Sequence, residues 1–296
     1  MTKDTVAVRH SFYLFLTAFI WGSAFVAQSV GNVMGPFTFN SIRNFLACFV
    51  LLPFIRIFYG NLKVNRVTLR GGICCGVCLF LASNVQQLGL VYTSPGKAGF
   101  ITACYMVIVP IVGAFLGQRI PRRVWIAVVM ALFGLYFLCI PKGESFQSVN
   151  LGDLLCLLCA CLFTLHILCI DHFTQMAEGV KMSCIQFFVC AVLSFVLMLF
   201  TEQPSLAGIR EGAAALLYAG IMSSGVAYSL QIVGQKGVHP AVASLILSLE
   251  SCFSVLTGWM ILGSKLNGRE LFGCAVMFAA IILTQLPERA GKGKKA

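Results

Sequence analysis

The stretch PAVASLILSLESCFSVLTGWMILG, residues Pro240–Gly263, decides the fold of this chain. It is longer than the roughly 20 apolar residues that cross a bilayer as one helix, yet it carries a carboxylate, Glu250, near its middle. An ionisable side chain at that depth costs about 2.5–3.5 kcal/mol on insertion scales and indicates a functional site. The stretch therefore predicts a transmembrane helix with a polar site inside the bilayer.

The rest of the chain has the composition of a membrane protein. Of its 296 residues, 59% are hydrophobic and 10% are charged, and the mean hydropathy is +0.91. Soluble domains carry about 25% charged residues, so a soluble protein is excluded. We predict an all-α polytopic membrane protein with ten transmembrane helices. Their predicted bounds are 11–30, 36–58, 71–92, 98–117, 124–140, 153–170, 182–200, 212–234, 241–262 and 271–286.

The net charge of +11 would also suit a nucleic-acid-binding protein, but the basic residues lie mainly in the short predicted loops and tails. There they set the orientation of a membrane protein. With a cytoplasmic N-terminus, 15 of the 21 Lys and Arg residues fall on the inner side, five on the outer side and Arg43 within a span. We therefore expect both termini in the cytoplasm, the lipid bilayer as a partner and no nucleic acid.

The 14 cysteines fall almost entirely inside apolar runs, where a free cysteine behaves as a small hydrophobic residue. Two CxxC pairs occur, Cys75/Cys78 and Cys156/Cys159, but redox and metal sites need polar, accessible surroundings. We expect no metal and no cofactor. The first apolar run is too long for a signal-peptide core and lacks an A-x-A exit, so we expect it to be retained as a span.

An internal repeat relates the two halves of the chain. At a constant separation of 145 positions, the matches are Gln86 with Gln231, Gly89 with Gly234, Pro95 with Pro240, and Tyr105 with Glu250. Each half holds five predicted spans, an odd number, so the second half must enter the membrane upside down. We therefore predict two inverted-topology five-helix repeats, residues 11–141 and 153–287, with short cytoplasmic tails at 1–10 and 288–296. Inverted repeats around a midplane site are typical of secondary transporters.

Four stretches carry a family resemblance: WGSAF at Trp21–Phe25, GPFTFNSIRNF at Gly35–Phe45, GKAGFITACYMVIVPIVG at Gly96–Gly113, and SLESCFSVLTGWMILGSKL at Ser248–Leu266. In this order the chain resembles the drug/metabolite transporter superfamily, EamA type, with one unit in each half. The resemblance implies ten transmembrane helices around a central cavity. It also implies a bacterial cytoplasmic (inner) membrane and transport of small metabolites such as amino acids, with export favoured over uptake.

One departure from the family pattern affects the stretch Pro240–Gly263. The usual second-repeat pattern has a proline directly after the glutamate, and here that position is Ser251. A glutamate further on is replaced by Ser264. Because proline is a common cause of helix kinks, the resemblance alone does not predict a break in this helix.

Glu250 and Arg43 are the first candidates for the site. At 1.5 Å per residue, Arg43 lies about 10 Å below the outer surface and Glu250 about 15 Å above the inner one. In a hydrocarbon core of about 30 Å, the two side chains reach similar levels. Glu250 could bind a cation of the cargo, carry a proton or pair with Arg43. Arg43 could bind a carboxylate of the cargo or only neutralise Glu250.

Polar side chains at membrane depth need partners, either across a helix interface or in a cavity. The eighth span carries such residues on one helix face, at i, i+4, i+7 and i+11: Ser224, Tyr228, Gln231 and Gln235. The third span carries the amides Asn84, Gln86 and Gln87. Because Gln86 and Gln231 are repeat counterparts, we expect them to line a cavity. Further candidates are Tyr105, Trp21, Gln28, Asn40 and His166.

Three classes of function fit a membrane protein: an enzyme, a secondary transporter, and a channel-like or scramblase-like facilitator. An enzyme needs a reactive set, and HExxH, GxSxG and paired intramembrane aspartates are all missing from the sequence. We therefore predict that the protein is not an enzyme. A channel-like or scramblase-like facilitator without coupling is the alternative to a secondary transporter that works by alternating access. Cargo, coupling to protons, and the choice between monomer and homodimer stay open.

Overall fold

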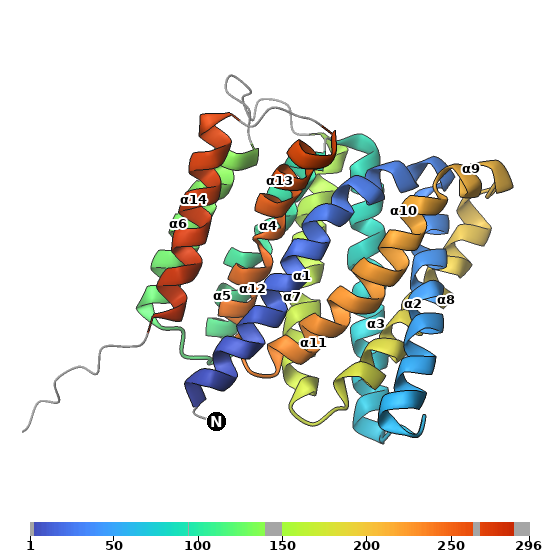
Figure 1. The fold of residues 1–296 in the computed structure, drawn as a ribbon, viewed down its shortest axis with the longest axis horizontal. Coiled ribbons are helices and arrows are strands. Elements are labelled where there is room, and N and C mark those ends of the chain that lie inside the picture. The colour runs from blue at the N-terminus through green and yellow to red at the C-terminus, as the bar shows by residue number, and fades with distance from the viewer. Residues whose placement is uncertain (1–2, 94, 140–149, 263–266, 287–296) are drawn as a thin grey trace, which may run out of the picture.

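The computed structural model describes residues 3–93, 95–139, 150–262 and 267–286, and its secondary structure over these ranges is helical, as predicted (Figure 1). The elements of the first half are α1 (Lys3–Gly31), η1 (Asn32–Met34), α2 (Pro36–Tyr59), α3 (Arg66–Tyr92), α4 (Pro95–Ala103), α5 (Tyr105–Phe115) and α6 (Arg122–Cys139). Those of the second half are α7 (Leu151–Thr174), α8 (Gly179–Thr201), α9 (Leu206–Glu211), α10 (Ala213–Tyr218), η2 (Ala219–Tyr228), α11 (Ser229–Gln235), α12 (Pro240–Leu247), α13 (Glu250–Leu262) and α14 (Gly268–Gln285). The predicted tail 288–296 lies outside the described residues.

Within the described ranges, nine helical segments are long and apolar enough to cross a membrane. They include three composite spans, which are Ala98–Phe115, Ala213–Gln235 and Pro240–Thr257. A further span, bent by 44° between Ala7–Phe25 and Ala27–Met34, makes ten if the bent pair counts as one. The polytopic all-α prediction is confirmed, whereas the helix count is nine or ten according to how α1 is treated.

The helix that carries Glu250 is broken, and so is its repeat counterpart. The first break lies at Cys104, between α4 and α5, and the second at Ser248 and Leu249, between α12 and α13. At both breaks the backbone makes an i→i−3 bond, with Cys104 N donating to Ile101 O at 3.2 Å and Leu249 N to Ile246 O at 3.2 Å. The break in the second repeat therefore forms without the proline that Ser251 replaces.

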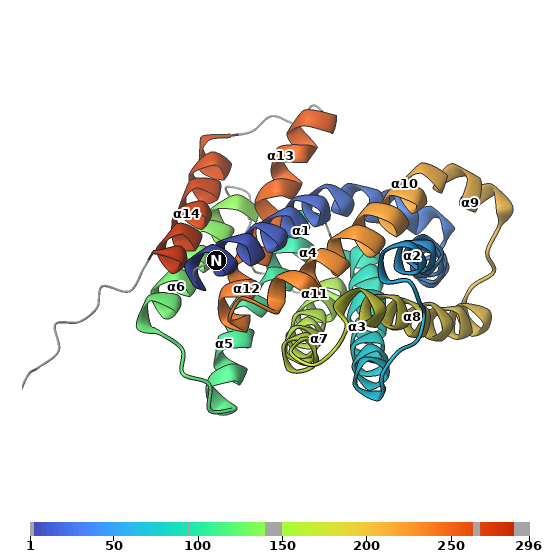
Figure 2. The ribbon, with the colours of Figure 1, turned by 60° about the horizontal axis from the view of Figure 1, so that its bottom comes forward.

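The two sequence repeats interleave in space. In the first repeat α3 packs against α7 and α8, and the related segment α10–η2–α11 packs against α1 and α2 (Figures 1 and 2). Helices α4 and α5 pack against α7, while α12 and α13 pack against α1. We call α3, α4, α5 and α7 the first bundle, and α1, α10, η2, α11, α12 and α13 the second bundle. The first bundle therefore contains α7 of the second repeat, and the second bundle contains α1 of the first repeat.

Two helix pairs complete the fold, α2 with α8 and α6 with α14, and each pairs a helix with its own repeat counterpart. The α6–α14 pair lies at one edge of the molecule (Figure 1). A Cβ atom added at Gly134 would meet Gly273 O at 2.8 Å, and one added at Gly273 would meet Gly134 O at 2.6 Å. These two glycines therefore allow the close approach of the two backbones.

Gly273→Ala is expected to lower the melting temperature of the purified protein, because the new methyl group meets a backbone carbonyl that cannot move independently. We expect a cost of about 1–3 kcal/mol, typical of overpacking. The matched control is Gly268→Ala, since nothing lies within 4 Å of a Cβ atom there. Helix propensity alone would make both changes neutral or stabilising, so equal melting temperatures for both variants would contradict the packing argument.

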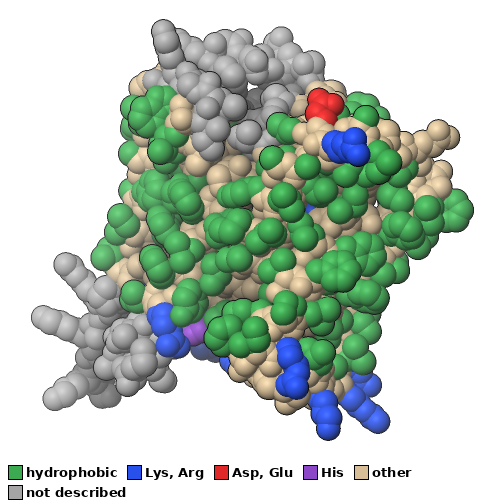
Figure 3. Space-filling model, turned by 45° about the vertical axis from the view of Figure 1, so that its right-hand side comes forward, with side chains coloured by type: hydrophobic (Ala, Val, Ile, Leu, Met, Phe, Trp, Pro, Cys, Tyr) green, Lys and Arg blue, Asp and Glu red, His purple; other side chains and the backbone are tan. Residues whose placement is uncertain are grey.

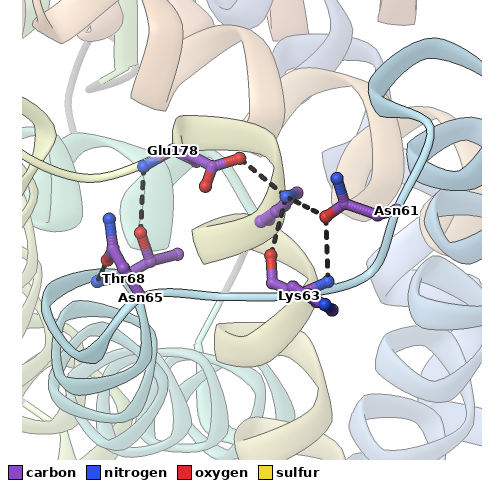
Figure 4. Close-up of polar contacts among 6 residues, drawn as sticks. Asn61, Lys63, Asn65, Thr68 and Glu178 are labelled. Carbon is purple, nitrogen blue, oxygen red and sulfur yellow. Dashed lines mark hydrogen bonds and ion pairs between the residues drawn. The ribbon is translucent and has the colours of Figure 1, made fainter.

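Two groups of polar contacts join α2 to α8, one at each end of this helix pair. Near the start of α8, the Lys181 ammonium lies 2.7 Å from Lys63 O, 3.3 Å from Asn61 Oδ1 and 2.8 Å from Glu178 Oε2. Figure 4 shows this network, in which Glu178 N also donates to Thr68 Oγ1 at 3.1 Å. Lys181 is buried, and its acceptors come mostly from the chain that follows α2.

At the other end of the α2–α8 pair, the carboxylate of Glu202, which follows α8, caps the N-terminus of α2. Its oxygens accept bonds from Phe37 N at 2.9 Å and from Thr38 N at 2.8 Å, and from the Thr38 hydroxyl at 2.6 Å. A carboxylate is favourable there because the first N–H groups of a helix lack partners within the helix. Together the Lys181 and Glu202 contacts fix α2 to α8 at both ends of the pair.

Lys181→Met is expected to lower the melting temperature by the equivalent of about 0.5–1.5 kcal/mol, because it removes the hydrogen bonds that the buried ammonium donates to Lys63 O and Asn61 Oδ1. Lys63→Met is the matched control, because the Lys63 side chain is exposed and its carbonyl stays in place. An unchanged melting temperature for Lys181→Met would show that the contact contributes nothing to stability.

Candidate functional site

A narrow cavity lies between the two bundles. Its first-bundle lining consists of Gln86, Tyr105, Phe163 and Ile167. The second bundle contributes Trp21, Phe25, Gln28, Ser223, Tyr228, Gln231, Leu247 and Glu250, and α2 contributes Arg43. The volume is about 30 Å³, room for about two water molecules. A metabolite therefore needs the walls to separate before it can occupy this site.

Arg43 brings an unpaired positive charge to the cavity. Its side chain is 3% exposed, and its guanidinium carbon lies 5.4 Å from the centroid of the Phe39 ring. No described residue accepts a hydrogen bond from it, and its Nε is buried without a partner. A buried charge of this kind is costly unless something neutralises it, so the cavity favours an anionic group near Arg43.

Glu250 is the first residue of α13, directly after the break, and its repeat counterpart Tyr105 is the first residue of α5. The Tyr105 hydroxyl donates to Glu250 Oε1 at 3.1 Å. Two repeat-related residues can touch only near the axis that relates the repeats, so the cavity lies on that axis. Although both charges line one cavity, Glu250 and Arg43 form no ion pair with each other in the described structure.

The aromatic wall of the cavity is built by Trp21 and Tyr228, whose ring centroids lie 4.5 Å apart. Trp21 Nε1 donates to Ser223 O at 3.3 Å, which fixes the indole against η2. The centroid of the Tyr228 ring also lies 5.8 Å from that of Phe187 and 6.0 Å from that of His166. The wall is therefore braced by side chains from both bundles and from α8.

The segment η2 is a π-helix of 10 residues, a rare form that often marks functional sites. It changes which face of the eighth span meets the cavity. The α-helical pattern predicts Ser224 beside Tyr228, but the structure places Ser223 in the lining instead. Ser223 and Tyr228 are five residues apart, the period of a π-helix, so the wider helix is the physical reason for the difference.

The structure brings together eight of the residues that the sequence proposes for the site. They are Glu250, Arg43, Gln86, Gln231, Tyr228, Tyr105, Trp21 and Gln28. Gln28 Oε1 and Gln231 Oε1 are buried without a hydrogen-bond partner, as is Arg43 Nε. Buried polar atoms are nearly always paired, so these three atoms are available to a polar group that binds in the cavity.

Four proposed residues lie outside the cavity lining and serve contacts between helices. Asn40 donates to Ser83 O at 3.1 Å and to Asn84 Oδ1 at 3.0 Å, and Asn84 donates to Ser194 Oγ at 2.8 Å. Gln87 and His166 likewise hold neighbouring helices. Gln87 Nε2 donates to Gln28 O at 2.8 Å, and His166 Nε2 lies 3.1 Å from Gln186 Oε1.

Five lining residues were not proposed from the sequence as site residues: Phe25, Phe163, Ile167, Ser223 and Leu247. Four of these are apolar residues in apolar helices, where nothing in the sequence separates a cavity wall from a core or a lipid-facing position. Only Phe25 carried a signal, since it follows Trp21 by one helical turn. Among the described residues, no group of three or more His, Cys, Asp or Glu side chains is arranged to hold a metal ion.

Comparison with known proteins identifies the family. The model of the EamA-like transporter family matches the chain twice, over residues 9–140 and 150–286. The chain belongs to the EamA-like transporter family. An uncharacterized transporter of Archaeoglobus fulgidus is 30% identical over 275 residues, covering 92% of this chain and 84% of its own. The uncharacterized transporter YoaV of Bacillus subtilis is 20% identical, covering 89% of this chain and 92% of its own.

A solved crystal structure with 18% sequence identity superposes with a TM-score of 0.80 and covers 94% of this chain and 96% of that chain. It shows that the fold is a known one. The predicted family and the arrangement in two repeats are thereby confirmed. EamA-like proteins are drug and metabolite transporters, which places this chain with membrane transporters rather than with enzymes.

Proposed function

We propose that this EamA-like protein is a secondary transporter of small metabolites that carry both a carboxylate and a cationic group, such as amino acids. One observation carries the proposal: Arg43 and Glu250 line the same buried cavity without pairing with each other. A zwitterion would neutralise both charges at once. Its carboxylate would accept hydrogen bonds from the Arg43 guanidinium, and its ammonium would donate to Glu250.

The architecture supports alternating access between the two bundles. The cavity lies on their interface, and it is too narrow for a metabolite until they separate. The moving bodies in this proposal are the interleaved bundles rather than the two sequence repeats, because α1 and α7 pack with the opposite repeat. The α2–α8 pair, fixed at both ends by the Lys181 and Glu202 contacts, would serve as the static axis.

We also propose cytoplasmic termini, an outward direction of transport and coupling to protons. The excess of Lys and Arg on one side supports cytoplasmic termini, and the basic side chains on the face shown in Figure 3 lie mostly along its lower edge. The resemblance to the drug/metabolite transporter superfamily is the reason for proposing the inner membrane and the outward direction. Proton coupling through Glu250 is a further element, since a carboxylate that can bind an ammonium can also bind a proton.

Counterflow in liposomes tests whether the protein works as a carrier. Vesicles loaded with an unlabelled amino acid should take up the labelled form transiently above its equilibrium level, with a rate that saturates. A thermal-shift screen of amino acids, organic acids and amines then tests the cargo, because a ligand that binds only the folded protein raises its melting temperature. Flux that neither saturates nor shows counterflow would favour the channel-like alternative. Stabilisation by acids alone, or by amines alone, would reject the zwitterion.

A further inference from the structure

A second hollow lies on the side of η2 that faces away from the central cavity. Its volume is about 390 Å³, far larger than that of the central cavity. Side chains of α1, α2, α8 and the η2–α11 segment form its walls, among them Tyr13, Leu51, Phe54, Val226, Leu230 and Val233. We refer to it as the lateral groove. All four walls belong to predicted or observed membrane spans, so the groove opens at membrane depth.

The chemistry of the lateral groove is that of a hydrocarbon site. Its lining is apolar except for Ser229 and the Tyr13 hydroxyl. The Ser229 hydroxyl already donates to Gly225 O at 2.7 Å, so it does not require an external partner. A polar metabolite would lose its water in this groove without gaining hydrogen bonds, whereas an acyl chain fits such walls.

One wall of the groove contains a glycine, Gly225. At the repeat separation of 145 positions, Gly225 corresponds to Phe80, a partly buried residue that packs against the main hydrophobic core. A Cβ atom added at Gly225 would meet only Gly220 O at 3.4 Å and Val50 Cγ1 at 4.0 Å, which are ordinary contacts. The glycine is therefore not required for close backbone approach. At this position the second repeat therefore puts no side chain into the groove, whereas the first repeat has a phenylalanine.

Three basic residues lie close in sequence to residues that line the groove. Arg9 lies one helical turn before Tyr13, and Arg56 and Lys236 come two and three residues after Phe54 and Val233. All three basic side chains are exposed. The α1 side of this rim is tied to the α11 side, because His10 Nδ1 lies 2.7 Å from Val233 O. Such a rim at the membrane surface attracts the phosphate of an anionic lipid.

We propose that the lateral groove binds one acyl chain of an anionic phospholipid, whose phosphate lies among Arg9, Arg56 and Lys236. The bound chain would lie against η2 on the face opposite to Ser223 and Tyr228, which line the central cavity. The site is independent of the cargo, so the proposal stands or falls separately from the transport function.

The test measures the melting temperature of the purified full chain in detergent with added dioleoyl phosphatidylglycerol or dioleoyl phosphatidylcholine. We expect both lipids to raise the melting temperature of the wild type, and phosphatidylglycerol to raise it more. Gly225→Phe, which copies the residue of the first repeat, should remove the rise with both lipids. The triple variant Arg9→Gln, Arg56→Gln, Lys236→Gln should lose only the advantage of phosphatidylglycerol over phosphatidylcholine.

The matched control is the triple variant Arg66→Gln, Arg70→Gln, Arg122→Gln, which removes three exposed basic side chains away from the groove. It should respond to both lipids as the wild type does. An equal loss in this control would assign the effect to overall charge and overturn the headgroup site. A full lipid response in Gly225→Phe would overturn the groove itself. If either groove variant, Gly225→Phe or Leu230→Trp, folds poorly, the other is used. Native mass spectrometry then counts the lipids retained per chain and shows whether the groove binds lipid.

Discussion

Replacing Arg43 with alanine is expected to weaken transport strongly while leaving the protein folded. Arg43 is the only guanidinium in the described cavity lining, and no described residue accepts a hydrogen bond from it. Its removal therefore breaks no hydrogen bond among the described residues. It does remove the group that would hold the carboxylate of the cargo. A hydrogen bond to a charged group contributes about 1.5–3 kcal/mol, so we expect the apparent affinity to fall by roughly 10- to 150-fold.

Uptake into liposomes measures the loss of transport. The cargo-induced thermal shift measures the loss of affinity for the cargo. Arg43→Lys is the informative companion, because it keeps the charge but loses the two-pronged geometry that matches a carboxylate. We expect partial recovery with a higher KM. A fully active Arg43→Ala variant would demote Arg43 to a packing residue. A variant that is inactive because it does not fold would be recognised by a lowered melting temperature without cargo.

Glu250→Gln is expected to eliminate uphill transport driven by a pH gradient. Glutamine keeps the volume of the side chain and can still accept the Tyr105 hydrogen bond, but it cannot take up a proton or balance a cation. If Glu250 carries the proton, downhill exchange should persist while the response to the gradient disappears. If Glu250 binds only the ammonium of the cargo, exchange should weaken as well.

The experiment compares accumulation with and without a pH gradient in wild type, Glu250→Gln and a control, Glu211→Gln. Glu211 is an exposed carboxylate at the end of α9, outside the candidate spans. The control should accumulate cargo as the wild type does. Equal rates with and without the gradient in the wild type, together with no change in Glu250→Gln, would remove Glu250 from both coupling and binding.

Much of the candidate site could be predicted because charge and amide groups are conspicuous in an apolar chain. Arg43, Glu250 and the pair Gln86 and Gln231 stand out against their neighbours, and all four line the cavity. The same signal also selects polar residues that hold helices together, which is why Asn40 and Asn84 were proposed with them. An amide in a helix interface and an amide in a cavity look alike in sequence, because both avoid lipid.

The sequence by itself determined the membrane class, the family and the two repeats. Those follow from hydropathy and from residues at fixed separations, which depend on the chain alone. Only the tertiary structure decided that α1 and α7 exchange bundles, that η2 turns Ser223 into the cavity, and that Glu250 meets Tyr105 rather than Arg43. The physical reason is that these features depend on packing between helices far apart in the chain. In helices apolar on all sides, the sequence does not mark which face meets which neighbour.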